Sequence, residues 1–212
     1  MAKLPSRSAT RWTVSILGCL VGYAGFEHGI GEILQGNVAP SGVMIRSWPH
    51  SEAFRILDGE PAMTLIPNLL VSGWLTIVVS VGLTIWVVGF VHRRFGALIF
   101  LGLCIVLLLV GGGFGPPLMG VILGAAATRI HRQSAWGQRI PEVVRAGFSR
   151  IWSISIAACI CGYLALFPGM VLLSHFTSLA SPALVGMLAL FSFAMLGIAI
   201  LGGLARDSLP RV

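Results

Sequence analysis

The sequence has little charge: only 10% of its 212 residues are Asp, Glu, Lys or Arg, whereas 56% are hydrophobic. Its mean hydropathy is +0.92, and a chain of this composition has too little polar surface to cover a water-exposed globule. This argues against a soluble enzyme, a nucleic-acid-binding domain and a disordered tail. The pI of about 10.3 therefore indicates basic loops at a membrane surface and no nucleic-acid partner.

Cysteine and asparagine are also scarce. The four cysteines all lie in apolar runs, at Cys19, Cys104, Cys159 and Cys161. This placement argues against a disulfide framework, and the last two would point about 200° apart on a helix, which is unsuited to chelating one metal ion. Neither Asn37 nor Asn68 begins a glycosylation sequon. We therefore expect a prokaryotic plasma (inner) membrane protein.

Long apolar runs fill most of the chain and predict an all-α, polytopic transmembrane bundle of about six spans, in one domain covering residues 1–212. The runs cover residues 12–34, 61–91, 95–130, 151–174 and 183–204. The third of them is interrupted by the sequence GGGFGPP at 111–117 and has arginines at both ends. A single crossing would place one basic end outside, against the positive-inside rule. We therefore expect the third and fourth spans to form a hairpin that turns at the Gly/Pro-rich segment.

The basic residues give this bundle an expected orientation. With both termini cytoplasmic, twelve of the 14 Lys and Arg residues lie on the inner side, and only Arg46 and Arg55 fall outside. Residues 129–150 are then a basic cytoplasmic loop that meets anionic lipid. On the outer side, residues 36–60 mix apolar with charged side chains, which predicts an interfacial cap over the outer mouth of the bundle.

Glycines in the first span follow a helical spacing. Gly18, Gly22, Gly25 and Gly29 recur at intervals of 4, 3 and 4 residues, which keeps them on one face and lets another backbone approach closely. We expect this packing seam to join helices within the chain. An interface between two copies of the chain, in a homo-oligomer, is the alternative.

The segment GFEHGIGEILQ at 25–35 carries the candidate site. In a helix His28, Glu32 and Gln35 share one face, and Glu27 lies about 100° away from His28. Ionisable groups near the end of a span are expensive unless they are paired, hydrated or bound to an ion, so they mark a functional site by default. His28 and Glu32 are suited to ligating a divalent metal ion. A proton relay, a site for a cationic solute and a structural ion pair at the membrane boundary are the alternatives.

The cap offers further ligands, because His50 and Glu52 are placed to complete a site begun by His28 and Glu32. A solvated loop anchored by Trp48 is the alternative reading of this stretch. The candidate ligand-binding set is Glu27, His28, Glu32, Gln35, His50 and Glu52.

Three segments carry a resemblance: FEHGIGEILQGN (26–37), GEPAM (59–63) and GGGFGPP (111–117). They resemble those of an uncharacterised group of prokaryotic polytopic integral membrane proteins. The resemblance covers residues 20–130 and implies a membrane fold, but no activity, because none is assigned to the group.

Three functions remain open at this point. The favoured one is a membrane protein that binds or passes an ion or small solute from the outer face. The second is a non-catalytic accessory or assembly subunit of a larger membrane complex. The third is an intramembrane metal- or haem-dependent protein; His28 and His175 both fall near the outer leaflet, yet no pair within one helix is spaced for haem. A divalent metal ion is the favoured cofactor, haem is less favoured, and enzymatic activity is not expected.

Overall fold

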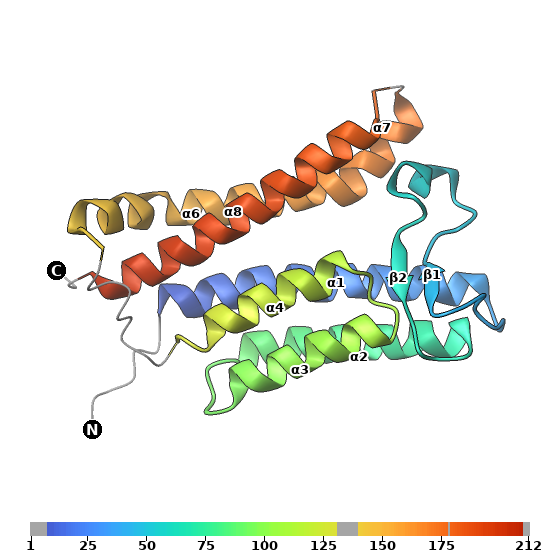
Figure 1. Ribbon diagram of the computed structural model, residues 1–212, viewed down its shortest axis with the longest axis horizontal. Helices are drawn as coiled ribbons and strands as arrows, with labels where there is room; N and C mark the ends of the chain where they lie inside the picture. The colour runs from blue at the N-terminus through green and yellow to red at the C-terminus, as the bar shows by residue number, and fades with distance from the viewer. Residues whose placement is uncertain (1–7, 131–139, 178, 210–212) are drawn as a thin grey trace.

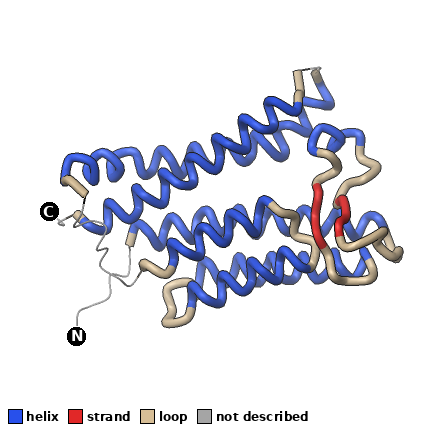
Figure 2. Tube along the Cα trace, in the orientation of Figure 1, coloured by secondary structure: helices blue, strands red, loops and turns tan. Residues whose placement is uncertain are grey.

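The computed structural model describes residues 8–130, 140–177 and 179–209, and within these ranges the protein is built mainly from helices (Figures 1 and 2). The helices are α1 (Ala9–Gln35), α2 (Leu69–Gly89), α3 (Gly96–Leu109), α4 (Gly115–Ala127), α6 (Glu142–Leu164), α7 (Met170–Phe176) and α8 (Pro182–Ser208). A π-helical turn, Ala165–Gly169, joins α6 to α7 around Pro168. The predicted all-α class is confirmed.

Three helical segments are long and apolar enough to cross a membrane: Leu69–Gly89, Glu142–Phe176 and Pro182–Ser208. Their outward faces expose large apolar side chains, such as Val78 on α2 and Leu190 on α8, which are 64% and 75% exposed. Contiguous apolar surface of this kind is rare on soluble monomers and marks contact with lipid or with a partner. These helices therefore support the prediction of a membrane protein.

The helices form two groups, and α1 is the member of one group that faces the other (Figure 1). The α6 and α8 helices pack together along one side, while α1 to α4 form the other, and α1 touches α2, α4, α6 and α8. At the end away from the cap, the carboxylate of Asp207 near the end of α8 accepts hydrogen bonds from the amides of Ala9 and Thr10, at 2.7 and 2.9 Å. An anion at the N-terminus of a helix satisfies its free N–H groups and favours its dipole. This contact holds the beginning of α1 beside the end of α8.

The glycine seam of α1 faces α2 along its length. A Cβ added at Gly18, Gly22 or Gly29 would overlap atoms of α2, and one at Gly25 would overlap Ser80 of α2 and Leu107 of α3. The two backbones therefore approach within the chain at a distance that larger side chains would not permit.

Residues 36–68 form the cap at the other end, and they contain a feature the sequence did not predict. Two three-residue strands, β1 (Met44–Arg46) and β2 (Pro61–Met63), pair antiparallel, with Ile45 opposite Ala62. A 3₁₀ helix, Glu52–Leu57, lies between them. Strands this short carry too few residues for the period-2 pattern that identifies a strand. The ribbon continues into an isolated bridge between Thr64 and Val110, which ties the cap to the end of α3.

Other boundaries also differ from the prediction. The apolar run expected from residue 61 becomes helical only at Leu69, because β2 takes its beginning. The basic stretch expected as a loop from 129 to 150 becomes helical at Glu142, and its middle, 131–139, lies outside the described residues.

Candidate metal centre

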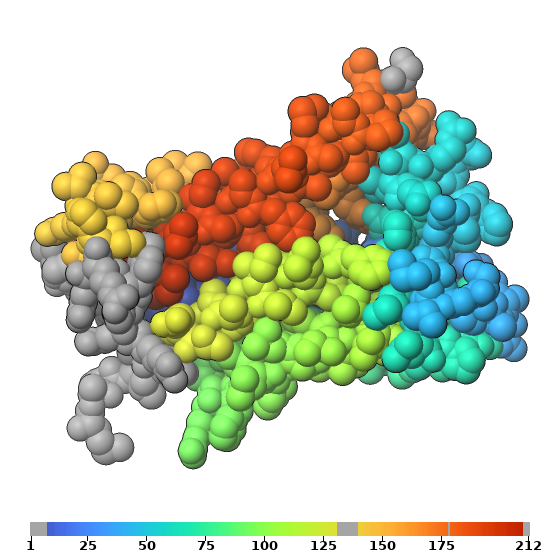
Figure 3. Space-filling view, viewed as in Figure 1, coloured from blue at the N-terminus to red at the C-terminus, as the bar shows by residue number. Residues whose placement is uncertain are grey.

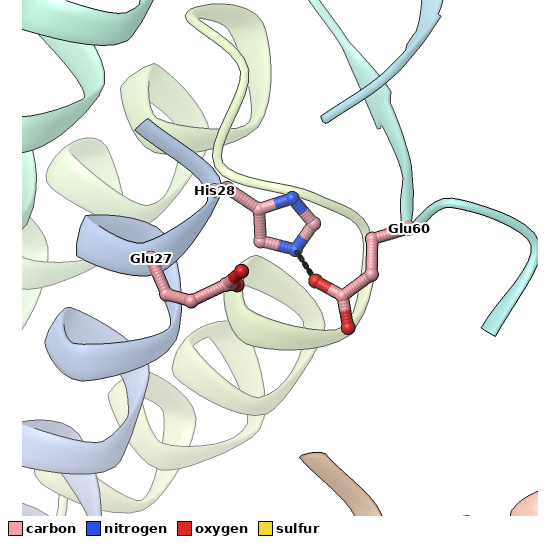
Figure 4. A group of neighbouring side chains, drawn as sticks. All are labelled: Glu27, His28 and Glu60. Atoms are coloured by element: carbon pink, nitrogen blue, oxygen red, sulfur yellow. Dashed lines mark ion pairs between the residues drawn. The ribbon is translucent and has the colours of Figure 1, made fainter. Parts of the chain in front are cut away.

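Three ionisable side chains meet beneath the cap. Glu27 and His28 come from α1, and Glu60 comes from the residue immediately before β2 (Figure 4). One donor atom from each lies within 4.8 Å of the other two. The group therefore joins a nitrogen and two carboxylates from segments that are about thirty residues apart in the sequence, a pairing that no single helix could provide.

His28 is held at both ring nitrogens. Its Nδ1 lies 2.7 Å from the hydroxyl of Ser47, the residue that follows β1, and its Nε2 lies 3.2 Å from Oε2 of Glu60. If Nδ1 donates its proton to Ser47, Nε2 presents a lone pair toward a carboxylate oxygen, and two acceptors need a proton or a cation between them. The arrangement matches metal-binding histidines, whose second nitrogen is fixed by an outer hydrogen bond.

Glu60 reaches this place through an unusual turn. Asp58, Gly59 and Glu60 all have positive φ, at 52°, 65° and 56°, although only glycine adopts this region without cost. The turn is supported outside by an ion pair between Arg46 and Asp58, at 2.9 Å, and inside by the Ser47 amide, which donates to the Glu60 carbonyl at 3.0 Å. Backbone strain of this kind concentrates at functional sites, where the surrounding structure maintains it.

Burial makes the Glu60 carboxyl an unusually weak acid. Its side chain is 12% exposed, and the loss of hydration, which disfavours the charged form, raises its pKa to about 7. Near neutral pH this carboxyl is thus poised to exchange its proton for another cation.

Glu27 is the least satisfied member of the group. It is 9% exposed, and neither of its carboxylate oxygens accepts a well-directed hydrogen bond from any described residue. The indole N–H of Trp48 is a neighbour, but it too lacks a well-directed acceptor among those residues. Figure 4 shows the Glu27 carboxylate directed toward His28 and Glu60. A buried carboxylate without a partner carries a desolvation penalty that a proton or a bound cation removes.

Aromatic stacking closes the cap over the cluster. Trp48 stacks on Phe54 of the 3₁₀ helix with ring centroids 4.6 Å apart, and Phe54 contacts Phe167 of the π-helical turn at 5.6 Å. The cap is therefore fixed to the α6–α8 side of the protein as well as to α1.

A pocket of about 460 Å³ adjoins the cluster, between α4 and α8. His28 and Glu60 lie at its polar end, and Tyr163 of α6 also lines it. The space-filling view shows a hollow between α8 and α4 beside the cap (Figure 3). The cluster is thus reached from a cavity rather than sealed in packed protein.

Glu32 occupies a separate position one turn further along α1. It is fully buried, and neither of its carboxylate oxygens accepts a well-directed hydrogen bond from a described residue, although Ser72 is a neighbour. A Cβ added at Gly111 would overlap the Glu32 carboxylate, and one added at Gly113 would overlap the His28 ring. Both glycines have positive φ, of 116° and 72°, so the turn after α3 both requires glycine and lies directly against these two side chains.

The other residues of the predicted ligand-binding set, Gln35, His50 and Glu52, lie outside the three-residue group. Gln35 donates hydrogen bonds to the carbonyls of Arg46 and Ser47, each at 3.0 Å, and so positions the strand end that holds His28. His50 and Glu52 are exposed on the cap, and Glu52 pairs with Arg55 at 3.4 Å. Of the predicted set, the structure brings only Glu27 and His28 together in the three-residue group, and it adds Glu60 from the cap.

Sequence reasoning missed Glu60 and Ser47. The available signal for Glu60 was its place in the segment GEPAM, directly after a glycine, in a cap that otherwise exposes its charges. For Ser47 the sequence carried no such signal.

Fold and site together define a helical protein, with three membrane-length helices, that holds a buried histidine–dicarboxylate cluster beneath a small cap. Comparison of the chain with protein-family models, with curated proteins and with solved structures found no match.

Proposed function

We propose that this protein is a multi-pass protein of the prokaryotic plasma membrane that binds a divalent metal ion through Glu27, His28 and Glu60. The observation that carries the proposal is the convergence of one imidazole nitrogen and two carboxylates within 4.8 Å, with both Glu27 oxygens buried and lacking a hydrogen-bond partner among the described residues. A divalent cation neutralises both carboxylates and supplies the partner that Glu27 lacks.

The donor set favours a transition metal. Imidazole nitrogen suits Zn²⁺, Fe²⁺ and similar ions, whereas Mg²⁺ and Ca²⁺ prefer oxygen alone. Ser47 fixes the ring that would present Nε2 to the ion, the role that outer-shell partners have at metal sites. Three protein ligands leave at least one coordination position open for water or another ligand.

The proposed topology has six spans, with both termini cytoplasmic and the cap outside. The α3 and α4 helices contain 14 and 13 residues, so each extends about 20 Å, less than the ~30 Å of a hydrocarbon core. They contact each other on either side of residues 110–114, and a hairpin of this kind keeps the flanking arginines on one side. Under this topology the metal site faces the outer surface.

We propose that the ion is bound at this site and is not passed across the membrane. Below the cluster, the hydroxyls of Ser72 and Thr76 both donate to the carbonyl of Val110. These hydrogen bonds join α2 to the end of α3, which argues for a structural role of the two hydroxyls.

The test is metal binding by purified protein stripped with a chelator. Calorimetric titration with Zn²⁺, and elemental analysis after dialysis, should give one ion per chain for the wild type. Glu27→Gln and Glu60→Gln should each weaken Zn²⁺ binding at least tenfold, because each amide keeps the shape of the side chain and removes a charged ligand.

The matched control is Glu52→Gln, which changes an exposed carboxylate of the same cap. It should bind Zn²⁺ like the wild type. Equal affinity in all four proteins, or a stoichiometry near zero in the wild type, would contradict the proposal.

A further inference from the structure

The pocket beside the cluster has two chemically distinct parts. Its polar end contains His28 and Glu60, whereas its walls are mostly apolar side chains from several elements, including Leu57, Met119, Phe167 and Phe193. Its volume of about 460 Å³ lies within the range of ≈ 300–1,000 Å³ typical of small-molecule sites. A ligand that fills it must therefore be mostly apolar with one polar end.

The charges at the polar end restrict that polar group. No Lys or Arg lies among the described residues that line the pocket, and Asp58, which borders it, is already paired with Arg46. Among the described lining residues, the hydroxyl groups of Tyr163 and Ser192 offer neutral hydrogen bonds, and the cluster with its ion offers the charge. With a divalent ion in place, Glu27 and Glu60 are neutralised and the open coordination position accepts an oxygen donor.

The position of the pocket indicates where such a ligand comes from. It lies between α4 and α8, two helices that touch each other little, and the hollow between them is visible on the surface (Figure 3). Phe114, just before α4, lines the pocket and is itself exposed, and Leu190 on α8 is exposed too. Apolar helix faces of this kind contact lipid, so a molecule already in the bilayer can enter from the side.

We propose that the pocket binds a long-chain carboxylic acid from the membrane, with its acyl chain along α4 and α8 and its carboxylate on the metal ion. This inference rests on the proposed metal binding and goes beyond it by naming the ligand class. No Lys or Arg lies among the described residues that line the pocket, so the positive charge that attracts an anionic head there comes from the bound ion.

The experiment uses the full chain in phosphatidylcholine nanodiscs, stripped of metal and then loaded with Zn²⁺ or Mn²⁺. Metal binding is measured first, without added acid. Palmitate labelled with ¹³C at its carboxyl carbon is then titrated, and Mn²⁺ should strongly broaden this carbon signal, because the unpaired electrons lie next to it. With Zn²⁺ loaded, palmitate should bind at least tenfold more tightly than to the metal-free protein.

Two α8 variants separate the pocket from the metal site. Ala189 lines the pocket, and Ala194 is exposed on the same helix outside it. Ala189→Phe should fill the pocket and weaken palmitate binding at least tenfold while leaving Zn²⁺ binding unchanged, whereas Ala194→Phe should leave both unchanged. Retained Zn²⁺ binding also shows that the variant is folded.

Each other result has a definite meaning. Normal metal binding together with palmitate binding that is independent of metal, or absent, overturns the ligand assignment and leaves the metal site standing. Tighter binding of hexadecylammonium than of palmitate also overturns it, since the head would then contact bare carboxylates. Failure of Zn²⁺ to bind in the first step refutes the proposed function and this inference with it. The broadening experiment needs no variant, so it decides the matter even if Ala189→Phe does not fold.

Discussion

Gly113→Ala should disturb the metal site without changing any ligand. Gly113 has φ of 72°, a conformation that costs an alanine roughly 1–2 kcal/mol. Its new methyl group would overlap the His28 imidazole, so the ring must withdraw by about 1 Å to restore van der Waals separation. His28 is held between Ser47 and Glu60, at 2.7 and 3.2 Å, and it cannot withdraw without lengthening at least one of these contacts.

The expected effect is a loss of affinity as well as stability. Disturbing the outer shell of a metal site typically lowers affinity about 10–100-fold, and we expect Gly113→Ala to weaken Zn²⁺ binding in that range. Calorimetric titration measures the affinity, and thermal unfolding followed by tryptophan fluorescence measures the stability.

Two neighbouring glycines supply matched controls. Gly111→Ala adds the same kind of strain in the same turn, but its methyl group overlaps Glu32 instead of His28. It should therefore destabilise the fold and bind Zn²⁺ nearly as the wild type does. Gly115 has no atom within 4 Å of an added Cβ, so Gly115→Ala should change neither property. Unchanged affinity in Gly113→Ala, or equal losses in Gly111→Ala and Gly113→Ala, would refute the reasoning.

Three further predictions concern acidity, packing and topology. Burial raises the pKa of Glu60 to about 7, so Zn²⁺ affinity should rise as the pH increases through 7, because the ion replaces the proton. In the metal-free protein the folded state holds this proton more tightly than the unfolded state, whose reference pKa is 4.5, so stability should fall as the pH rises from 4.5 to 7. A Zn²⁺ affinity that stays constant in calorimetry from pH 5.5 to 8.5 would contradict this prediction. Gly22→Leu should destabilise the protein by about 1–3 kcal/mol, because its side chain would overlap α2, whereas Gly82→Leu, with open space around it, should melt like the wild type. In a background without native cysteines, Ser51→Cys should react with an impermeant thiol reagent on intact cells and Arg93→Cys only after lysis; labelling of both from outside would rule out the proposed orientation.

Local sequence patterns predicted the helices well where an apolar run stood alone. The run 12–34 corresponds to α1 at Ala9–Gln35, and the run 183–204 corresponds to α8 at Pro182–Ser208. Hydrophobicity determines such segments because every backbone group must be satisfied within the helix when it is surrounded by lipid. The same argument could not locate β1 and β2, which are defined by pairing with each other rather than by composition.

The candidate site was harder to predict, because it joins residues of α1 to a residue of the cap. Helical periodicity correctly places His28 and Glu32 on one face of α1, and both indeed lie against the turn after α3. Periodicity cannot, however, predict which residue of another segment comes close. That depended on the left-handed turn at 58–60, which directs the Glu60 carboxylate back toward α1. Glu27 and His28 point about 100° apart around the axis of α1. The long side chain of Glu27 nevertheless brings its carboxylate close to His28 and Glu60.

The proposed metal ion also explains why the buried carboxylate of Glu27 is tolerated, although burying it costs stability. A carboxylate as buried as Glu27, with no hydrogen-bond partner among the described residues, lowers stability unless its charge is neutralised, and replacing it with an apolar residue would then stabilise the apoprotein. Apart from His28, the residues within three positions of Glu27 on α1 are apolar or small, so local structure does not demand a carboxylate there. The group around it is built from two helical residues, a strained turn and a serine that orients the histidine, and each of these carries a cost or a constraint of its own. A bound divalent ion offsets these costs together, because it neutralises two carboxylates and uses the free nitrogen that Ser47 orients.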